Sequence, residues 1–323
     1  MGKKICVVGG GRWGKNHIRT LFQIGKLGGI VESNPERLNE LLFQYPVQGF
    51  IELDDAIQQG YDGYVIATPA ETHYPIGKKL LKKGFNLLIE KPLCLSSEHA
   101  EELVTIAEKM KTSLMVGHLL LFHPAIIKIK EIIDSGKIGN LCYVYSNRLN
   151  LGTVRTEENV FWSFAPHDIS VLDYLIGSNA IKIEAKGTSF LQEKICDFTL
   201  AQFTYPENVH AHIFVSWLHP FKEQRLVVVG SKGMITFEDF STEKNIIYYD
   251  KHIDWVEERP VKVEQPDEII TYEKKMPMEE ELRYFIENLG KKIEIASGRS
   301  GHEVVKVLET VQKILNRNEW GAK

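Results

Sequence analysis

The sequence predicts an α/β protein with two domains, an N-terminal domain built on a parallel sheet and a C-terminal α+β domain with an open, mostly antiparallel sheet. Two observations support this prediction. As far as about residue 122, short apolar strands alternate with helical patterns, which is typical of a parallel sheet covered on both faces. Beyond it, strand patterns follow one another with turns between them, which favours antiparallel pairing. We therefore expect domains at residues 1–122 and 123–323.

The elements of the first domain follow from apolar periodicity and from the residues that usually begin or end helices. Pro35 suits the first turn of a helix, and Gly84 suits the residue after one. We expect strands at residues 4–8, 27–31, 64–67, 86–89 and 114–116, helices at 15–24, 34–44, 74–83 and 97–110, and a short helix around Ile57.

The second domain is expected to be richer in strands. One helix, which we expect to begin near Pro166 and to end near Ile176, interrupts them. We also expect helices at residues 124–134, 278–289 and 300–316, and strands at 141–149, 181–189, 197–205, 209–218, 224–229, 234–238 and 246–249.

Composition and charge argue against several classes of partner. The formal net charge is −4, so no basic excess points to a nucleic acid or a membrane surface. No apolar run approaches the roughly 20 residues that span a bilayer, and we see no signal peptide. The spacing of Cys6, Cys94, Cys142 and Cys196 fits neither a zinc site nor a redox pair. We expect a cytoplasmic protein with no metal and reduced thiols.

The first strand ends in a glycine motif. Residues 9–14, G-G-G-R-W-G, satisfy G-x-G-x-x-G between a predicted strand and a predicted helix. In such a turn Gly9 permits the tight bend, Gly11 lets a pyrophosphate approach the backbone, and Gly14 lets the helix pack closely on the strand. The N–H groups at the helix start favour an anion. The motif therefore predicts a Rossmann fold that binds a dinucleotide.

An acidic residue at the end of the second strand indicates which dinucleotide. Glu32 follows the strand at 27–31, where a carboxylate accepts the adenosine ribose hydroxyls and repels a 2′-phosphate. This favours NAD over NADP. Arg37 lies close enough in sequence to keep NADP open, since an arginine accommodates that phosphate.

Three further segments carry a family resemblance. They are A-T-P-A-E-T-H at residues 67–73, E-K-P at 90–92 and A-P-H-D-I at 165–169. With the glycine motif, they resemble the Gfo/Idh/MocA family of oxidoreductases, and the resemblance extends over essentially the whole chain. It implies a Rossmann domain followed by a domain that binds the substrate and mediates oligomerisation.

The resemblance also implies the catalytic residues. Lys91 and His167 are expected to face the substrate beside the nicotinamide, with a cis bond between Lys91 and Pro92. In such chemistry hydride leaves a carbinol carbon as a base accepts the hydroxyl proton. Desolvation beyond a strand end lowers a lysine pKa, and a helix start disfavours the imidazolium of His167. For the cofactor we expect contacts from Gly9, Gly11, Arg12, Trp13, Gly14, Glu32, Thr68, Pro69, His73, Glu90 and Lys91.

One position departs from the family pattern. Many members carry an aspartate four residues before the catalytic histidine, and here that residue is Ser163. Ser170 likewise replaces an acidic residue. Lys91 and His167 are therefore expected to work as a pair. Asp168 is an alternative third member, although an aspartate in a first helical turn is usually solvated.

The segments at 147–169 and 116–124 resemble the nucleotide-sugar dehydrogenases of the family, such as UDP-N-acetylglucosamine 3-dehydrogenases. Arginines suit a pyrophosphate, aromatic rings suit a base or sugar face, and polar groups suit sugar hydroxyls. Each of these residues also has an ordinary structural interpretation as a core or surface side chain. The candidate substrate residues are Arg148 and Arg155 for the pyrophosphate, Phe161 and Trp162 for stacking, and His118, Asn159 and His167 for the sugar.

The function expected from these residues is NAD-dependent oxidation of a secondary hydroxyl, at C3 of a UDP-linked N-acetylhexosamine, to a 3-keto sugar. Such a ketone is a natural substrate for an aminotransferase. A free-sugar or inositol dehydrogenase remains an alternative, as do an NAD-using glycosidase and a non-enzymatic NAD-sensing regulator. We expect a homodimer or homotetramer, with the open sheet face as the contact surface.

Overall fold

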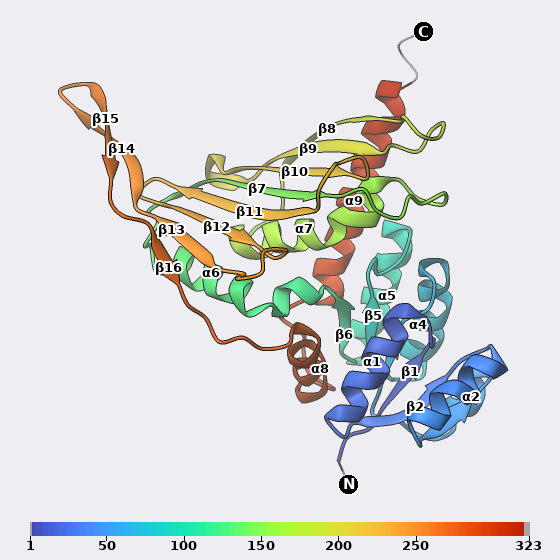
Figure 1. The fold of residues 1–323 in the computed structure, drawn as a ribbon. Helices are drawn as coiled ribbons and strands as arrows, with labels where there is room; N and C mark the ends of the chain where they lie inside the picture. Colours follow the sequence, from blue (N-terminus) through green and yellow to red (C-terminus); the bar gives the residue numbers. More distant parts are fainter. Residues whose placement is uncertain (1, 320–323) are drawn as a thin grey trace. The chain divides into compact units, whose positions relative to one another are not determined.

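The computed structural model describes residues 2–319, and these form two compact units. The first unit comprises residues 2–122 together with Lys275–Lys306. The second comprises His123–Lys274 together with residues 307–319. The chain thus leaves the first unit after Phe122 and returns to it before the end (Figure 1).

The first unit contains a six-stranded, fully parallel sheet in the order β3-β2-β1-β4-β5-β6. Its strands are apolar and almost completely buried, as expected for a sheet covered on both faces. The strands are β1 (Ile5–Val8), β2 (Leu27–Val31), β3 (Gln48–Phe50), β4 (Gly63–Ile66), β5 (Asn86–Glu90) and β6 (Leu114–Gly117), and the helices between them are α1 (Arg12–Gln23), α2 (Pro35–Gln44), α3 (Leu53–Ile57), α4 (His73–Lys82) and α5 (Ser97–Met110).

The strand order reverses beside β1, which pairs with β2 on one side and with β4 on the other. In open parallel sheets, ligands bind outside the carboxyl ends of the strands at such a reversal. The carboxyl ends of β1, β2, β4 and β5 therefore place the glycine turn, Glu32, Thr68 and Glu90 along one edge of the sheet. The predicted Rossmann fold is confirmed.

Residues 275–306 belong to the first unit, although we expected everything after residue 122 to lie in the second domain. Helix α8 (Pro277–Glu287) packs on α1 and on the 3₁₀ turn Leu119–Phe122. Helix α9 (Gly298–Glu319) begins in this unit and ends in the other.

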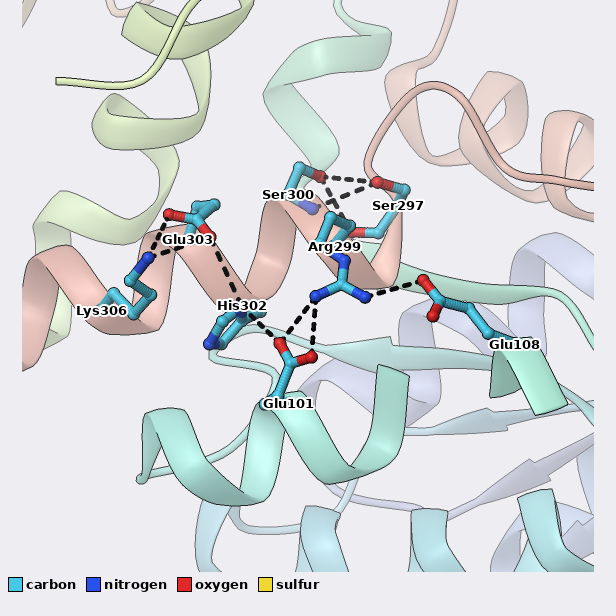
Figure 2. Close-up of polar contacts among 8 residues, drawn as sticks. All are labelled: Glu101, Glu108, Ser297, Arg299, Ser300, His302, Glu303 and Lys306. Carbon is cyan, nitrogen blue, oxygen red and sulfur yellow. Dashed lines mark hydrogen bonds and ion pairs between the residues drawn. The ribbon is translucent and has the colours of Figure 1, made fainter. Parts of the chain in front are cut away.

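Ion pairs attach the start of α9 to α5. Arg299 Nη1 contacts both carboxylate oxygens of Glu101, at 2.9 and 2.7 Å, and its Nη2 lies 2.8 Å from Glu108 (Figure 2). His302 Nδ1 also contacts Glu101, at 3.1 Å. These contacts join residues about two hundred positions apart, so no local sequence pattern predicts them.

The second unit contains an eight-stranded sheet in the order β16-β13-β12-β11-β7-β10-β9-β8. Only β7 and β10 pair in parallel, and the remaining pairs are antiparallel, so the predicted mostly antiparallel sheet is confirmed. Helices α6 (Pro124–Asp134) and α7 (Val160–Ile176) lie on one face (Figure 1). The strands are β7 (Leu141–Leu149), β8 (Lys182–Thr188), β9 (Phe198–Thr204), β10 (His210–Ser216), β11 (Glu223–Gly230), β12 (Met234–Glu238), β13 (Ile246–Tyr249) and β16 (Glu268–Ile270).

Four strands were absent from the sequence prediction: β3, β16 and the two-stranded ribbon of β14 (Lys251–Val256) and β15 (Arg259–Glu264). The ribbon extends from the second unit, and most of its residues are exposed on both faces (Figure 1). Apolar and polar residues do alternate in it, as Ile253, Asp254 and Trp255 show, but we did not use this short pattern in the prediction, and no buried face accompanies it. β3 and β16 are too short to show a period.

Candidate functional site

A cavity of about 660 Å³ lies along the carboxyl edge of the parallel sheet. Its walls come from the turn after β1, the end of β2, the loop after β4 and the end of β5, all within the first unit. The expected cofactor residues that line it are Gly9, Gly11, Arg12, Trp13, Glu32, Thr68, Pro69, His73, Glu90 and Lys91.

The glycine turn has the geometry that a pyrophosphate site needs. Gly9 has a φ of +98°, and a Cβ atom there would lie 2.8 Å from the carbonyl oxygen of Ala67. A Cβ atom on Gly14 would lie 1.9 Å from the carbonyl oxygen of Gly9. A Cβ atom on Gly11 would meet nothing within 4 Å, so the backbone there is open towards the cavity. Helix α1 has no acidic residue in its first turn and no side-chain cap, which leaves its N–H groups available to an anion.

Glu32 stands at the end of β2 with its carboxylate held by the backbone. Oε2 accepts the N–H of Gly10 at 2.8 Å, and Oε1 accepts that of Asn34 at 2.8 Å. Arg37 Nη1 lies 3.2 Å from Oε2. Burial opposes ionisation, but these backbone hydrogen bonds and Arg37 outweigh it and lower the pKa of Glu32. The residue therefore presents a fixed negative charge at the cavity.

His73, an expected cofactor contact, lines the cavity and also connects two of its loops. Its side chain is buried, Nδ1 lies 2.8 Å from the carbonyl oxygen of Pro92, and Nε2 lies 2.9 Å from that of Thr68. Burial lowers the pKa of His73, and a neutral ring has one N–H, so one of the two carbonyls accepts its hydrogen bond. The histidine ties the loop after β4 to the turn after β5, and in this way it shapes the cavity wall.

Lys91 follows β5 directly and lines the cavity, and the Lys91–Pro92 peptide bond is cis. The preceding Glu90 is buried, and its Oε1 lies 2.7 Å from Nε2 of His17 on α1. Its Oε2 accepts the backbone N–H of Lys91 at 3.1 Å. Burial opposes the charge on Glu90, but His17 and Lys91 outweigh it and lower its pKa. Glu90 therefore links His17 to the backbone of Lys91. Sequence reasoning missed His17, whose only signal is a polar residue on a buried helical face.

His118 comes directly after β6, where Glu90 pairs with Gly117 in the neighbouring strand register. It is 1% exposed, and neither ring nitrogen has a hydrogen-bond partner among residues 2–319. Burial, helped by the charge of Lys91 and opposed by Glu90, lowers its pKa to about 4. A neutral imidazole with unused polar atoms remains a candidate to bind a ligand.

The helix that carries His167 begins earlier than expected. Helix α7 starts at Val160, capped by Asn159, whose Oδ1 accepts the N–H groups of Phe161 and Trp162 at 3.0 Å each. Pro166 therefore lies inside the helix, not in its first turn. The expectation that a helix start disfavours the imidazolium of His167 is wrong, because the dipole effect is confined to the first turn.

Asp168 is also placed differently from its predicted solvated position. Its side chain is 4% exposed and accepts two hydrogen bonds from Arg148, from Nε at 2.8 Å and from Nη2 at 3.0 Å. Ser146 Oγ donates a third, at 2.6 Å. Two donors of Arg148 are thus committed within the protein, although we expected this guanidinium to clamp a pyrophosphate.

The remaining candidate substrate residues divide into structural and exposed groups. Asn159 caps α7 and donates from Nδ2 to Gln312 at 2.6 Å, so its amide is used within the unit. Phe161 is completely buried and cannot stack on a ligand. Trp162 is half-buried and Arg155 is exposed, so these two stay candidates.

Residues 2–319 contain no group of three His, Cys, Asp or Glu side chains that could hold a metal ion. None of the four cysteines forms a disulfide, and Cys142 is the exposed one among them. Within the same residues, no helix is long and apolar enough to cross a membrane.

Comparison with known proteins identifies the family. Residues 3–118 match the description "Oxidoreductase family, NAD-binding Rossmann fold", and residues 126–236 match the C-terminal domain of the same family. The chain belongs to the Gfo/Idh/MocA family of oxidoreductases. The predicted membership is confirmed, and the first unit is an NAD-binding Rossmann domain.

Several family members are similar in sequence or structure. A UDP-N-acetylglucosamine 3-dehydrogenase from Acidithiobacillus ferrooxidans is 27% identical over 65% of this chain and 66% of its own length. Its solved structure covers 98% of both chains, with a TM-score of 0.85 and 22% identity. An inositol 2-dehydrogenase from Corynebacterium glutamicum is 27% identical over 57% of each chain.

The sequence matches thus span less than two thirds of either relative. The WlbA dehydrogenase from Bordetella pertussis, solved with NADH and UDP-GlcNAcA, covers 98% of both chains with a TM-score of 0.79 and 19% identity. At this level of identity, the structural likeness establishes the fold.

Proposed function

We propose that the chain is an NAD-dependent dehydrogenase that oxidises C3 of a UDP-linked N-acetylhexosamine to a 3-keto sugar. The observation that carries the proposal is the placement of Lys91 in the wall of a cavity that also contains the glycine turn and Glu32. A dinucleotide with its pyrophosphate on that turn and its adenosine at Glu32 extends its reactive end towards Lys91.

The first unit fits NAD in three respects. Gly11 leaves the backbone open to a pyrophosphate, and α1 offers uncapped N–H groups to it. The ionised Glu32 suits the two ribose hydroxyls and opposes a 2′-phosphate. Bound NAD would supply a hydride acceptor, which the side chains of the protein do not provide.

The residues of the chain supply proton transfer and orientation. In this proposal Lys91 accepts the proton of the substrate hydroxyl as hydride leaves the same carbon, and His167 serves the same hydroxyl. Glu90, fixed by His17, stabilises the turn from which Lys91 projects. Ser163 replaces the aspartate of many relatives, so the proposed machinery is a lysine–histidine pair.

The substrate class is supported by two relatives and by the exposed side chains of the second unit. The Acidithiobacillus ferrooxidans enzyme is named for UDP-N-acetylglucosamine, and WlbA was solved with a UDP-sugar. Arg155 is exposed, Trp162 is half-buried, and both belong to the segment at 147–169 that resembles such enzymes. We assign Arg155 to the pyrophosphate and Trp162 to the sugar or base, and His118 to a sugar hydroxyl.

A free-sugar dehydrogenase is the second candidate, because an inositol 2-dehydrogenase matches at the same identity. A panel of UDP-sugars, free hexoses and inositols with NAD⁺, followed by NADH absorbance, separates the two. We expect UDP-N-acetylhexosamines to react and the free compounds to be inert. Turnover of free inositols or hexoses alone would overturn the nucleotide-sugar assignment.

The same panel separates the remaining classes. A glycosidase that borrows and returns hydride would cleave substrate without net NADH, and a sensor would bind NAD⁺ without turnover. We propose net NADH formation, with a ketone product that an aminotransferase-type reaction can consume. We also propose a homodimer or homotetramer through the sheet face opposite α6 and α7, measurable by light scattering.

A further inference from the structure

Arg148 and Asp168 form a buried, two-pronged ion pair in the second unit. Nε and Nη2 of the guanidinium donate to different oxygens of the carboxylate, at 2.8 and 3.0 Å. The exposed fractions of the two side chains are only 15% and 4%. Burial opposes the charge on Arg148, but the attraction of Asp168 outweighs it and raises the pKa of the guanidinium. Two parallel hydrogen bonds fix the orientation of the guanidinium relative to the carboxylate as well as the distance between them.

The pair joins a strand to the helix that carries the proposed catalytic histidine. Ser146 and Arg148 are two residues apart on β7, so they lie on the same face of the sheet, and both donate to Asp168 on α7. Asp168 directly follows His167 in that helix. Three hydrogen bonds to one carboxylate therefore fix how far α7 is rotated about its axis, and with it the direction of His167.

We propose that Arg148 is a positioning residue, which orients His167 through Asp168 and neutralises the carboxylate of Asp168. In this role Arg148 is not a ligand of the substrate pyrophosphate. This inference rests on the proposed catalytic role of His167. The pair acts by orienting helix α7 and not by direct contact with the histidine, because adjacent residues of a helix do not face each other.

The charge balance is local. Asp239 acts on Arg148 from a distance and is itself paired with Lys244 at 2.8 Å. Asp173, further along α7, accepts a hydrogen bond from Tyr205 at 3.0 Å. Helix α6 carries Glu131 and Asp134, which are paired with Lys128 and Lys130 of the same helix. Asp197, before β9, accepts the N–H of Leu191 at 2.8 Å.

Removing one partner leaves the other as an unbalanced buried charge. In Asp168→Asn the guanidinium of Arg148 loses its carboxylate partner, and its positive charge disfavours the imidazolium form of His167. The low-pH limb of the pH profile of kcat/KM, here called the acid limb, should therefore move to lower pH. In Arg148→Met the carboxylate stands alone and favours the imidazolium, so the limb should move to higher pH. Each shift should be on the order of one pH unit.

The double variant Arg148→Met/Asp168→Asn removes both charges. We expect its acid limb to return close to that of the unmodified protein, although kcat stays reduced because α7 is less firmly oriented. Its thermal midpoint should exceed those of both single variants. Arg283→Met is the control, since Arg283 pairs with Glu279 at 2.7 Å on α8 and should leave the acid limb in place.

The alternative role for Arg148 predicts a different pattern. If it bound pyrophosphate, Arg148→Met would raise the KM for the UDP-sugar at least tenfold, as we expect for Arg155→Met, with the acid limb unmoved in Asp168→Asn. That outcome would overturn the inference. A His167→Asn variant with undiminished kcat would instead overturn the catalytic assignment on which it rests, so the two failures are distinguishable.

Discussion

Nε2 of His17 lies 2.7 Å from Oε1 of Glu90, so a buried histidine on the first helix holds the carboxylate that precedes Lys91. This contact connects the helix that begins at the glycine turn with the strand end that carries the proposed base. The hydrogen bond therefore ties helix α1, which follows the glycine turn, to the end of β5 beside Lys91, within the first unit.

Replacing His17 by Leu should destabilise the protein by about 3 kcal/mol at pH 7, because the buried Glu90 loses its side-chain partner and keeps only the contribution of Lys91. The pKa of Glu90 is lowered on folding, so its contribution is complete above the ordinary value of 4.5 and is lost as the pH falls below it. Urea titrations at several pH values check this. A stability difference that stays constant down to pH 3 would contradict it.

Gly11 and Gly14 should respond differently to alanine. A methyl group on Gly11 meets nothing within 4 Å in the protein but enters the space proposed for the pyrophosphate, so folding should survive while NAD⁺ affinity falls by tenfold or more. The same change at Gly14 forces an overlap with the Gly9 carbonyl and should lower the thermal midpoint. Calorimetric titration and thermal melting of both variants test the distinction. Unchanged NAD⁺ affinity in Gly11→Ala would place the pyrophosphate elsewhere.

Glu32→Ala should relax the discrimination against NADP⁺. The change removes a fixed negative charge and releases Arg37, whose Nη1 lies 3.2 Å from the carboxylate, to meet a 2′-phosphate. We expect the ratio of the two dissociation constants to shift by about tenfold, which corresponds to one charge-assisted hydrogen bond. Adding Arg37→Ala should abolish the gain. An unaltered ratio in Glu32→Ala would remove Glu32 from the cofactor argument.

Glu281 of α8 is completely buried, and neither carboxylate oxygen has a hydrogen-bond partner among residues 2–319. Burial, assisted by the negative charge of Glu90, raises its pKa well above the ordinary 4.5. A carboxyl that ionises more readily in the unfolded chain costs stability as the pH rises above that value.

Glu281→Met should therefore stabilise the fold by about 1–3 kcal/mol at pH 8, and by less at pH 4.5. Thermal melting across this range measures the difference. Leu282→Met, a neighbouring buried position without a carboxyl group, serves as the comparison. A gain in stability that did not grow with pH would show that Glu281 is ionised in the folded protein.

The sequence predicts the first sheet well because its signals are local. The strand at Leu27–Val31 and the helix from Pro35 appear at the expected residues, since a buried parallel strand is a short apolar run and a proline favours a first turn. The glycine motif is likewise recognised from a few consecutive residues, although the Ala67 carbonyl that restricts Gly9 lies far along the chain and Gly11 has no steric requirement within the protein.

The start of α7 shows where a local rule fails. Pro166 resembles a first-turn residue, but the Asn159 side chain caps the helix seven positions earlier. The proline therefore lies in the second turn, where the helix forms despite the hydrogen bond that proline cannot donate. That error also placed Asp168 in solvent. Its partner Arg148 lies on a strand across the layer, a contact that depends on tertiary packing.

The pairing of Arg299 with Glu101 likewise has no sequence signature, so the return of residues 275–306 to the first unit could not be predicted. Which charged residues pair on an exposed surface depends on how the folded helices and strands bring them together. A sequence shows only that both residues are available.

The central claim is that NAD⁺ occupies the cavity along the glycine turn with Lys91 acting on the substrate. Calorimetric titration of NAD⁺ into the unmodified protein and Lys91→Met, together with their kcat for the reactive UDP-sugar, tests it most directly. We predict that the two NAD⁺ dissociation constants agree within about twofold while kcat falls by about 100-fold or more. Equal losses of affinity and turnover, or no uptake of NAD⁺ by the unmodified protein, would contradict the claim.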